Sequence, residues 1–590
     1  MVAGPAAGTP GTRVGPRRLA QGNDQGPSLA AEVGGAPLGK TNRPGLPSGM
    51  AEMLGAEPGP ASGLPGEPTQ LAALIESSGI GDVGHRGGGL PVRIAALPGP
   101  GGLSYDARPA IGLPSRRARP ESDVVHAIAR RFVIGRSGGE LAIDGRAREL
   151  PAEAFRRRDP GRRAEEAKKR GGTTGSEEAI ERGLEFLART QFPDGHWAIH
   201  EFPARAEAWP GETKSPPDPG KLVPLAKRLV ADEQGNARER KRLGELIQKH
   251  EAGTALGNDE LEDLGFLVRS ITLSPGQMES DSAATSLALL AFLGAGYTHT
   301  DGKHRATVTR AIDWLLANQG PDGDLFSKTG GAKYAWLYSH GIGAIALCEA
   351  YGMTPDDKRL EEPARKAIQF IVDTQNPSLG GWRYRPRQES DTSVSGWQLM
   401  ALKSAQMAGL AVPEAALRKV EHWLEQAEAP GGAASQYVYN PYAEDTPEQR
   451  PGRQPSRAMT AEALLMRMYL GWQRDNPALA RGADYLKANL PEVGTTDRPT
   501  RDSYYWYYAT QVMYHVGGPH GKAWNDRLRP LLETSQIKEG PLAGSWHPQR
   551  PIADRWGSAG GRHYVSTMNL LMLEVYYRTL PLYKTLRKDE

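Results

Sequence analysis

The 590-residue chain has little of several things that common protein classes need. Its one cysteine, Cys348, excludes a disulfide scaffold, a zinc finger and an iron–sulfur site. No apolar run approaches the roughly 18 residues of a membrane-spanning helix. The arginines near the start are not followed by the apolar stretch of a secretory signal. These absences predict a soluble protein of the cytoplasm.

Aromatic residues are almost missing from the first 175 positions. Only Tyr105, Phe132 and Phe155 occur there, without any Trp, although nearly half of the 71 Gly do. A segment with so little to bury cannot offset the entropy of ordering its backbone, so residues 1–174 are predicted to be a disordered leader, with a solvated charged block at 156–170. The leader also carries the positive excess behind the net charge of +3. The remainder is slightly acidic, which argues against a strongly basic nucleic-acid binder.

From residue 176 onward one phrase recurs. Each copy is an amphipathic segment that leads to a Gln, a Gly-containing turn and, in several copies, a Trp. Copies start near Ala179, Ala311, Ala367, Val420, Arg481 and Leu528. Internal repeats of this kind predict stacked helical units.

A second helix of different character follows each copy. These segments consist of small residues, Leu and Met, and carry little charge. Their ranges are 283–296, 341–351, 394–409, 459–470, 508–516 and 565–577. Helices that are apolar all round are buried, whereas the amphipathic ones cover them from outside.

Six such pairs are enough to close a ring and protect the end repeats. The predicted fold class is therefore all-α, an α/α toroid over residues 175–590 with inner and outer rings of about six helices. A long gap at 203–278 is predicted to hold two charged helices, at about 220–250 and 258–272. This insertion is interpreted as a lid or a surface appendage.

The best copy of the phrase, Arg-Gly-x-x-x-Leu-x-x-x-Gln-x-x-Asp-Gly-x-Trp at 182–197, resembles a known repeat. It is similar to the repeat shared by squalene and oxidosqualene cyclases and the β-subunits of protein prenyltransferases. This resemblance implies an α/α toroid with parallel inner helices around a cavity. The Gln and Trp of the phrase, here Gln191 and Trp197, are expected to join neighbouring repeats and to have no catalytic role.

Parallel inner helices bring their N-terminal ends to one mouth. The residues near those ends are Asp281, His340, Asp391, Arg457, Asp502 and His563. Asp281 and Asp391 share the phrase Glu-Ser-Asp followed by Ser or Thr. Each Asp can simply be a helix N-cap, but His and Arg are poor caps, so their presence at the same mouth favours a site. Candidate catalytic residues are Asp391, Asp281, Asp502, His340 and His563, and candidate substrate-binding residues are Arg457, Tyr338, Trp397, Tyr505, Trp506 and Tyr564.

Three chemistries remain open at this mouth. The resemblance implies alkene protonation by an Asp-x-Asp-Asp-Thr cluster, but here Gln388 and Ser390 replace its first Asp and its proton-donating Asp. The aromatic residues near the inner-helix starts nevertheless suit an apolar cavity that stabilises cations. The resemblance also implies a zinc site, for which Asp502 and His563 match while Tyr504 replaces the Cys. In the third chemistry, Asp281 and Asp391 act as an acid/base pair on a carbohydrate.

We therefore expect a terpene cyclase-like or prenyltransferase-like enzyme that acts on an isoprenoid or another apolar substrate. No cofactor is expected, with zinc at Asp502 and His563 as the alternative. The expected partner is an apolar small molecule or lipid, which is compatible with peripheral membrane contact, and not a nucleic acid. The alternative function is a non-catalytic ring that binds a lipid, a peptide or a protein.

Overall fold

The computed structural model of the chain describes residues 155–203, 218–327, 335–429, 435–447 and 449–579. Most of the predicted leader, residues 1–154, lies outside these ranges. The described residues form α-helices with isolated β-bridges and no strand. None of their helices combines the length and the hydropathy needed to cross a bilayer.

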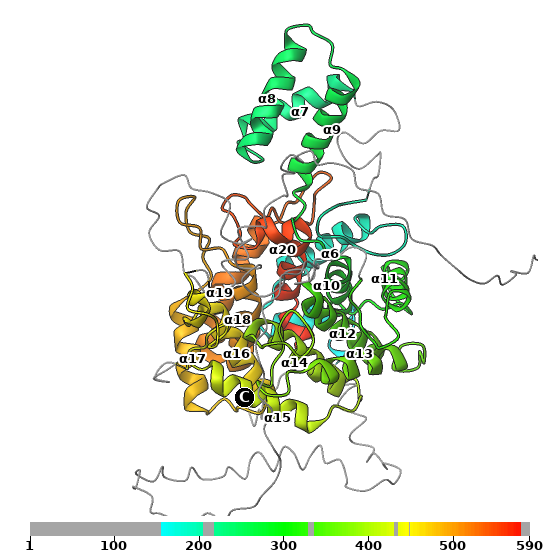
Figure 1. The fold of residues 1–590 in the computed structure, drawn as a ribbon. Coiled ribbons are helices and arrows are strands. Elements are labelled where there is room, and N and C mark those ends of the chain that lie inside the picture. Colours follow the sequence, from blue (N-terminus) through cyan, green and yellow to red (C-terminus); the bar gives the residue numbers. More distant parts are fainter. Residues whose placement is uncertain (1–154, 204–217, 328–334, 430–434, 448, 580–590) are drawn as a thin grey trace, which may run out of the picture. The chain divides into compact units, whose positions relative to one another are not determined.

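Six buried helices form the inner ring (Figure 1). They are α10 (Asp281–Gly294), α12 (Trp336–Met353), α14 (Thr392–Met407), α16 (Arg457–Tyr469), α18 (Ser503–Val516) and α20 (Gly557–Leu573). Each packs against the next, and α20 packs against both α18 and α10, so the ring closes. The α/α toroid predicted from the repeats is confirmed.

Six amphipathic helices cover this ring from outside. They are α6 (Thr174–Arg189), α11 (Arg305–Ala317), α13 (Glu361–Thr374), α15 (Glu414–Ala427), α17 (Pro477–Ala488) and α19 (Gly518–Ser535). Each packs on an inner helix with its apolar side, and the last outer helix, α19, contacts the first one, α6. The outer helices expose their charged residues, as the periodicity predicts.

The repeated Gln joins one outer helix to the next. Gln375 Nε2 donates to the carbonyl oxygens of Gly380 and Ala416, at 2.8 and 3.0 Å. The Gly has a positive φ of 86°, and a Cβ there would lie 2.1 Å from the carbonyl oxygen of Lys419 on α15. No side chain fits this contact, so a glycine is required. The Gln of the repeat phrase thus joins neighbouring repeats, as the sequence analysis predicts.

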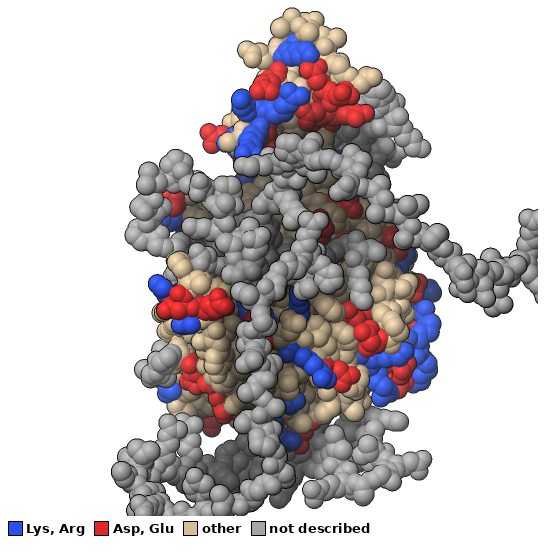
Figure 2. Space-filling model, viewed as in Figure 1, with Lys and Arg blue, Asp and Glu red and all other residues tan. Residues whose placement is uncertain are grey.

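The insertion contains three helices where two were predicted. They are α7 (Pro219–Ala231), α8 (Ala237–Glu251) and α9 (Asn258–Leu273), and they enclose an apolar core of their own. The predicted first helix is divided because Glu233 and Gly235 have positive φ and Asn236 caps α8. Figure 2 shows basic and acidic side chains together on this unit. Its interpretation as a lid or an appendage stays a prediction.

The structured region begins earlier than predicted. Residues placed in the leader form α5 (Arg163–Lys169), and Arg158 is only 1% exposed. Arg158 Nη1 lies 2.6 Å from Glu349 Oε2 on α12, and its Nη2 donates to the carbonyl oxygen of Arg578 at 3.1 Å. The charged block is therefore not simply solvated, because its partner is a buried carboxylate at the C-terminal end of an inner helix.

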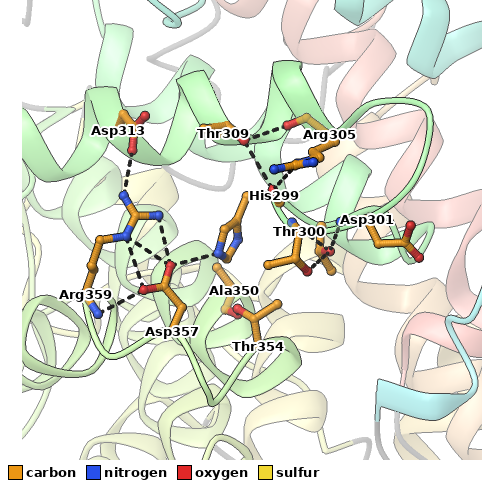
Figure 3. A network of polar contacts seen from close by, with 11 residues as sticks. His299, Thr300, Asp301, Arg305, Thr309, Asp313, Ala350, Thr354, Asp357 and Arg359 are labelled. Carbon is orange, nitrogen blue, oxygen red and sulfur yellow. Dashed lines mark hydrogen bonds and ion pairs between the residues drawn. The ribbon is translucent and has the colours of Figure 1, made fainter.

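Polar contacts tie together two loops that follow inner helices (Figure 3). Nε2 of His299, in the loop after α10, lies 2.9 Å from Oδ2 of Asp357, in the loop after α12. Arg359 bonds the same carboxylate and lies 3.4 Å from Asp313 on α11. Hydrogen bonds from Arg359 lower the pKa of Asp357 to about 2. The network fastens the first two helix pairs at the end opposite the predicted mouth.

Candidate functional site

The N-terminal turns of the inner helices meet at one end of the ring. Ser280 Oγ lies 2.7 Å from Ser339 Oγ, which joins α10 to α12. Across the ring, Trp556 Nε1 donates to Oδ1 of Asp502 at 3.1 Å, which joins the approach to α20 with the start of α18. These neighbouring inner helices thus contact one another at their starts. Which side chains face one another there depends on the register of each helix.

Four inner helices are capped in the same way. The capping side chain accepts a hydrogen bond from the backbone N–H three residues further on, as N-caps do. The caps are Ser280, Asp391, Ser456 and Asp502.

The shared Glu-Ser-Asp phrase is therefore offset by one residue between its two copies. Ser280 caps α10, so Asp281 is the first helical residue, whereas Asp391 is itself the cap of α14. Asp281 faces His200, with Oδ1 and Nδ1 3.9 Å apart. Burial raises its pKa, against the two neighbouring histidines. Asp281 and Asp391 are consequently not a matched pair of carboxylates.

Asp391 is fully buried and has two distinct sides. Its Oδ1 accepts hydrogen bonds from the Val394 backbone N–H at 2.7 Å and from Ser393 Oγ at 3.0 Å. Its Oδ2 accepts the hydroxyl of Tyr439 at 3.0 Å and lies 3.7 Å from Nε of Arg383. Burial raises the pKa of Asp391 to about 6, although Arg383 and these donors favour the carboxylate. One oxygen caps the helix, and the other faces a polar and aromatic neighbourhood.

Tyrosines surround this carboxyl group. The hydroxyls of Tyr384 and Tyr439 lie 2.6 Å apart, so Tyr439 connects Tyr384 with Asp391. The guanidinium of Arg383 lies 5.0 Å from the centre of the Tyr384 ring and 5.9 Å from that of Tyr439. The hydroxyl of Tyr338, a predicted substrate-binding residue, is hydrogen-bonded to Ser393. The structure thus brings Tyr338 and Asp391 into one cluster.

Glu462 is a member of this cluster that the sequence analysis missed. It lies on α16, is fully buried, and accepts the hydroxyl of Tyr504 on Oε2 at 3.0 Å. Burial raises its pKa well above the ordinary range, and the nearby charge of Asp391 adds to the effect. The available signal was that Glu462 is the single carboxylate of this inner helix. We call Asp391, Glu462 and the surrounding tyrosines 338, 384, 439 and 504 the acid cluster.

Asp502 belongs to a separate group. Its Oδ1 caps α18 through the Tyr505 backbone N–H at 2.9 Å, and its Oδ2 lies 3.8 Å from Arg555. The neighbouring Asp554 is buried, which raises its pKa to about 6. Both oxygens of Asp554 accept hydrogen bonds from Ser503, from its backbone N–H and its hydroxyl. These bonds fasten the loop before α20 to the start of α18.

The two predicted catalytic histidines bond to backbone carbonyl groups. His340 is fully buried, with Nε2 3.0 Å from the carbonyl oxygen of Ala367 on the outer helix α13, and its Nδ1 accepts the Leu325 N–H. His563 Nε2 lies 2.9 Å from the carbonyl oxygen of Ala284 on α10, and burial lowers the pKa of His563 to about 4. The structure does not bring either ring into the acid cluster. Both imidazoles join helices.

The remaining predicted binding residues fall into four places. Trp397 stacks on Tyr507 of α18 across the ring interior, with ring centres 5.6 Å apart. Arg457 lies over the ring of Tyr505, whose hydroxyl donates to the carbonyl oxygen of Asn489 and so points toward the outer helices. Trp506 is buried in the core, and Tyr564 lies beside Asp502, Asp554 and Ser503.

The donor set does not fit zinc. In the described part of the chain, no three His, Cys, Asp or Glu side chains are arranged to hold a metal ion. Tyr504, at the position of the missing Cys, donates to Glu462. Burial raises the pKa of the Cys348 thiol, and Cys348 lies in the middle of α12 away from Asp502.

The chain matches no protein-family model and no curated protein. Among solved structures it is similar to the type II terpene cyclase MstE from Scytonema, at 13% identity over 70% of this chain and 100% of that one, with a TM-score of 0.37. A protein from Actinoplanes is 14% identical over 69% of this chain and 100% of that one, with a TM-score of 0.34. Rex8A from Paenibacillus barcinonensis complexed with xylose is 14% identical over 51% of this chain and 84% of that one, with a TM-score of 0.34. Identities and TM-scores this low assign no activity, and the toroid is defined by its own helix contacts.

Proposed function

We propose that the chain is an enzyme that carries out acid-initiated chemistry on an apolar, alkene-containing substrate of the isoprenoid class. The observation that carries this proposal is the environment of Asp391, a carboxyl group with no exposure at the meeting point of the inner-helix starts. Its Oδ2 faces Tyr439 and Arg383, among aromatic rings. Such a setting supports a carboxylate that acts on developing positive charge, because aromatic faces and a buried anion both stabilise a cation.

The substrate class follows from what surrounds the acid cluster. Trp397, Tyr507 and Tyr508 pack together in the ring interior, with ring centres 5.1 to 5.8 Å apart. These faces suit an apolar chain and would not satisfy the many hydroxyls of a sugar. The carbohydrate alternative also loses its pair, because Asp281 and Asp391 occupy different positions at the helix starts.

The test is turnover of apolar alkenes by the purified chain. Squalene, geranylgeraniol and geranylgeranyl diphosphate would be incubated with it, and products of unchanged mass but altered retention sought by gas chromatography and mass spectrometry. Asp391→Asn should abolish such products, because the amide cannot carry the charge or the proton, while it still caps α14. The matched control is Ser456→Ala, which removes the cap of α16 and should lower stability by about 1 kcal/mol without loss of turnover.

The outcome that contradicts this proposal is equally specific. If no substrate is converted, or if Asp391→Asn retains full turnover, the carboxyl group is a cap only. The non-catalytic ring would then be the better description of the chain. Binding of the same three compounds to both proteins would decide between an inactive carrier and a ring without a ligand.

A further inference from the structure

Glu462 is buried at a cost that its contacts do not offset. Tyr504 donates one hydrogen bond to Oε2, and Oε1 has no hydrogen-bond partner in the described part of the chain. The bare Cα of Gly396 on α14 leaves the space for Oε1, since a Cβ there would lie 1.9 Å from it. A buried carboxyl without a cation is expensive unless it is neutral. A Leu or a Met at this position would pack without that cost.

The groups that face Glu462 are acidic or aromatic. Tyr504 and Tyr508 approach from α18, and Asp391 acts from the start of α14. Arg383 lies beside Asp391, whereas no arginine among the described residues forms an ion pair with Glu462. The two carboxyl groups of the acid cluster thus have different surroundings: Asp391 has a cationic neighbour and accepts three hydrogen bonds, whereas Glu462 has tyrosines beside it. Environments that separate two carboxyl groups in this way assign the acid and the base of a pair.

We propose that Glu462 is the proton donor of the acid cluster and that Asp391, as a carboxylate, faces the positive charge that forms. This inference rests on the proposed function and divides its chemistry between two residues. The raised pKa of Glu462 agrees with a proton held at neutral pH, and the pKa of about 6 for Asp391 agrees with its ionised form.

The steps balance without a further reactant. The O–H of Glu462 delivers its proton to one alkene carbon, the π electrons form the new C–H bond, and the O–H electron pair stays on the Glu462 carboxylate. The neighbouring carbon becomes cationic opposite Asp391. Asp391 then takes a proton from a carbon next to the cation, and that C–H pair becomes a C=C bond. Return of this proton to Glu462 restores the enzyme, and the product is an isomer of the substrate.

The experiment compares Glu462→Gln with Glu574→Gln. Glu574 is also a fully buried glutamate at an inner-helix end, but it lies beside Arg578, outside the acid cluster. With the same three alkenes, Glu462→Gln should lower turnover by a factor of about 10² to 10⁴, the range of general acid catalysis. Glu574→Gln should retain it within threefold. Infrared difference spectra between the wild type and each variant at neutral pH should show the loss of a protonated carboxyl band for Glu462→Gln and no such loss for Asp391→Asn. Burial also raises the pKa of Glu574, so Glu574→Gln identifies the separate band of that residue.

Each outcome decides something. Turnover by the wild type with an active Glu462→Gln overturns the proton-donor role and leaves the proposed function standing. A difference spectrum between the wild type and Glu462→Gln that contains no protonated carboxyl band also overturns it, because Glu462 then holds no proton. If the wild type converts none of the alkenes, the inference falls together with the proposed function. Should Glu462→Gln not fold, Glu462→Asp replaces it, since this variant keeps the acid but withdraws it by one methylene and should be equally impaired.

Discussion

Gln536 Nε2 donates to the carbonyl oxygen of Ala179 at 2.7 Å, across 357 positions of sequence. The same amide donates to Gly544 at 3.0 Å, so the last copy of the repeat phrase repeats the two bonds that Gln375 makes within the ring. Here the neighbouring outer helix is the first one, α6. One side chain therefore joins the end of the repeat array to its beginning.

Substitution of this glutamine measures ring closure. Gln536→Ala leaves two buried carbonyl groups without their donor, which should cost about 1 to 3 kcal/mol in the free energy of unfolding. Gln375→Ala removes the equivalent bonds between two consecutive outer helices and should cost about the same. Urea denaturation followed by circular dichroism compares them. An open ring would give a loss for Gln375→Ala and none for Gln536→Ala.

A second prediction concerns the buried charges at the opposite end of the ring. Glu349 accepts from Arg158 and from Arg578, and all three side chains are nearly inaccessible. Arg158→Met should cost about 3 to 5 kcal/mol, since removal of one partner leaves buried charge uncompensated. The exposed pair Arg365–Glu361 on α13 is the control, and Arg365→Met should cost less than about 1 kcal/mol. Similar small losses for both variants would show that Arg158 does not hold this end together.

Combining Arg158→Met with Glu349→Gln sharpens the measurement. If the two residues act as a pair, the double variant should lose less stability than the sum of the single losses, because neither charge is then left alone. Strict additivity would mean that each side chain is stabilised by other partners.

The contrast between these two features shows what the sequence could predict. The ring was predictable because its Gln, Gly and Trp recur in a local phrase, and Gln191, Gln319, Gln375 and Gln536 each make the same pair of hydrogen bonds. The partner of Arg158 was not, since Glu349 lies 191 residues away and nothing in the charged block marks it as buried. From the sequence alone the arginines of the charged block are expected to be solvated, and only the structure shows that Arg158 is buried against the inner ring.

The residues of the candidate site were likewise predictable only in part. Asp391 was found because it directly precedes an inner helix, and Glu462 could have been found as the only carboxylate of its inner helix. His340 and His563 lie within the first two turns of their helices, where the direction of a side chain depends on helical register. A shift of one residue turns a side chain by about 100° around the helix axis, which is why both rings meet backbone carbonyls of neighbouring helices. The position of a residue in the sequence does not give the direction in which its side chain points from the helix.

The last prediction is a pH dependence with opposite signs at two residues. Burial raises the pKa of Asp391 from 3.8 to about 6, so between pH 4 and 6 the folded chain holds a proton that the unfolded chain has released. Asp391 therefore makes stability fall as pH rises through that window. His563 does the reverse: its pKa is lowered from 6.5 to about 4, and the unfolded chain binds the extra proton, so its contribution rises with pH.

Urea denaturation at pH 4, 5, 6 and 7 separates the two effects. Relative to the wild type, Asp391→Asn should gain up to about 3 kcal/mol between pH 4 and pH 7, since each pKa unit corresponds to about 1.4 kcal/mol. His563→Gln should lose part of the rise between pH 4 and 6.5, because glutamine binds no proton in either state. Asp554, whose pKa is also raised to about 6, is present in all three proteins and cancels from the comparison. If the free energy of unfolding changes with pH in the same way for the wild type and Asp391→Asn, Asp391 titrates as an ordinary exposed carboxylate. That result would contradict the raised pKa assigned to its burial in the acid cluster.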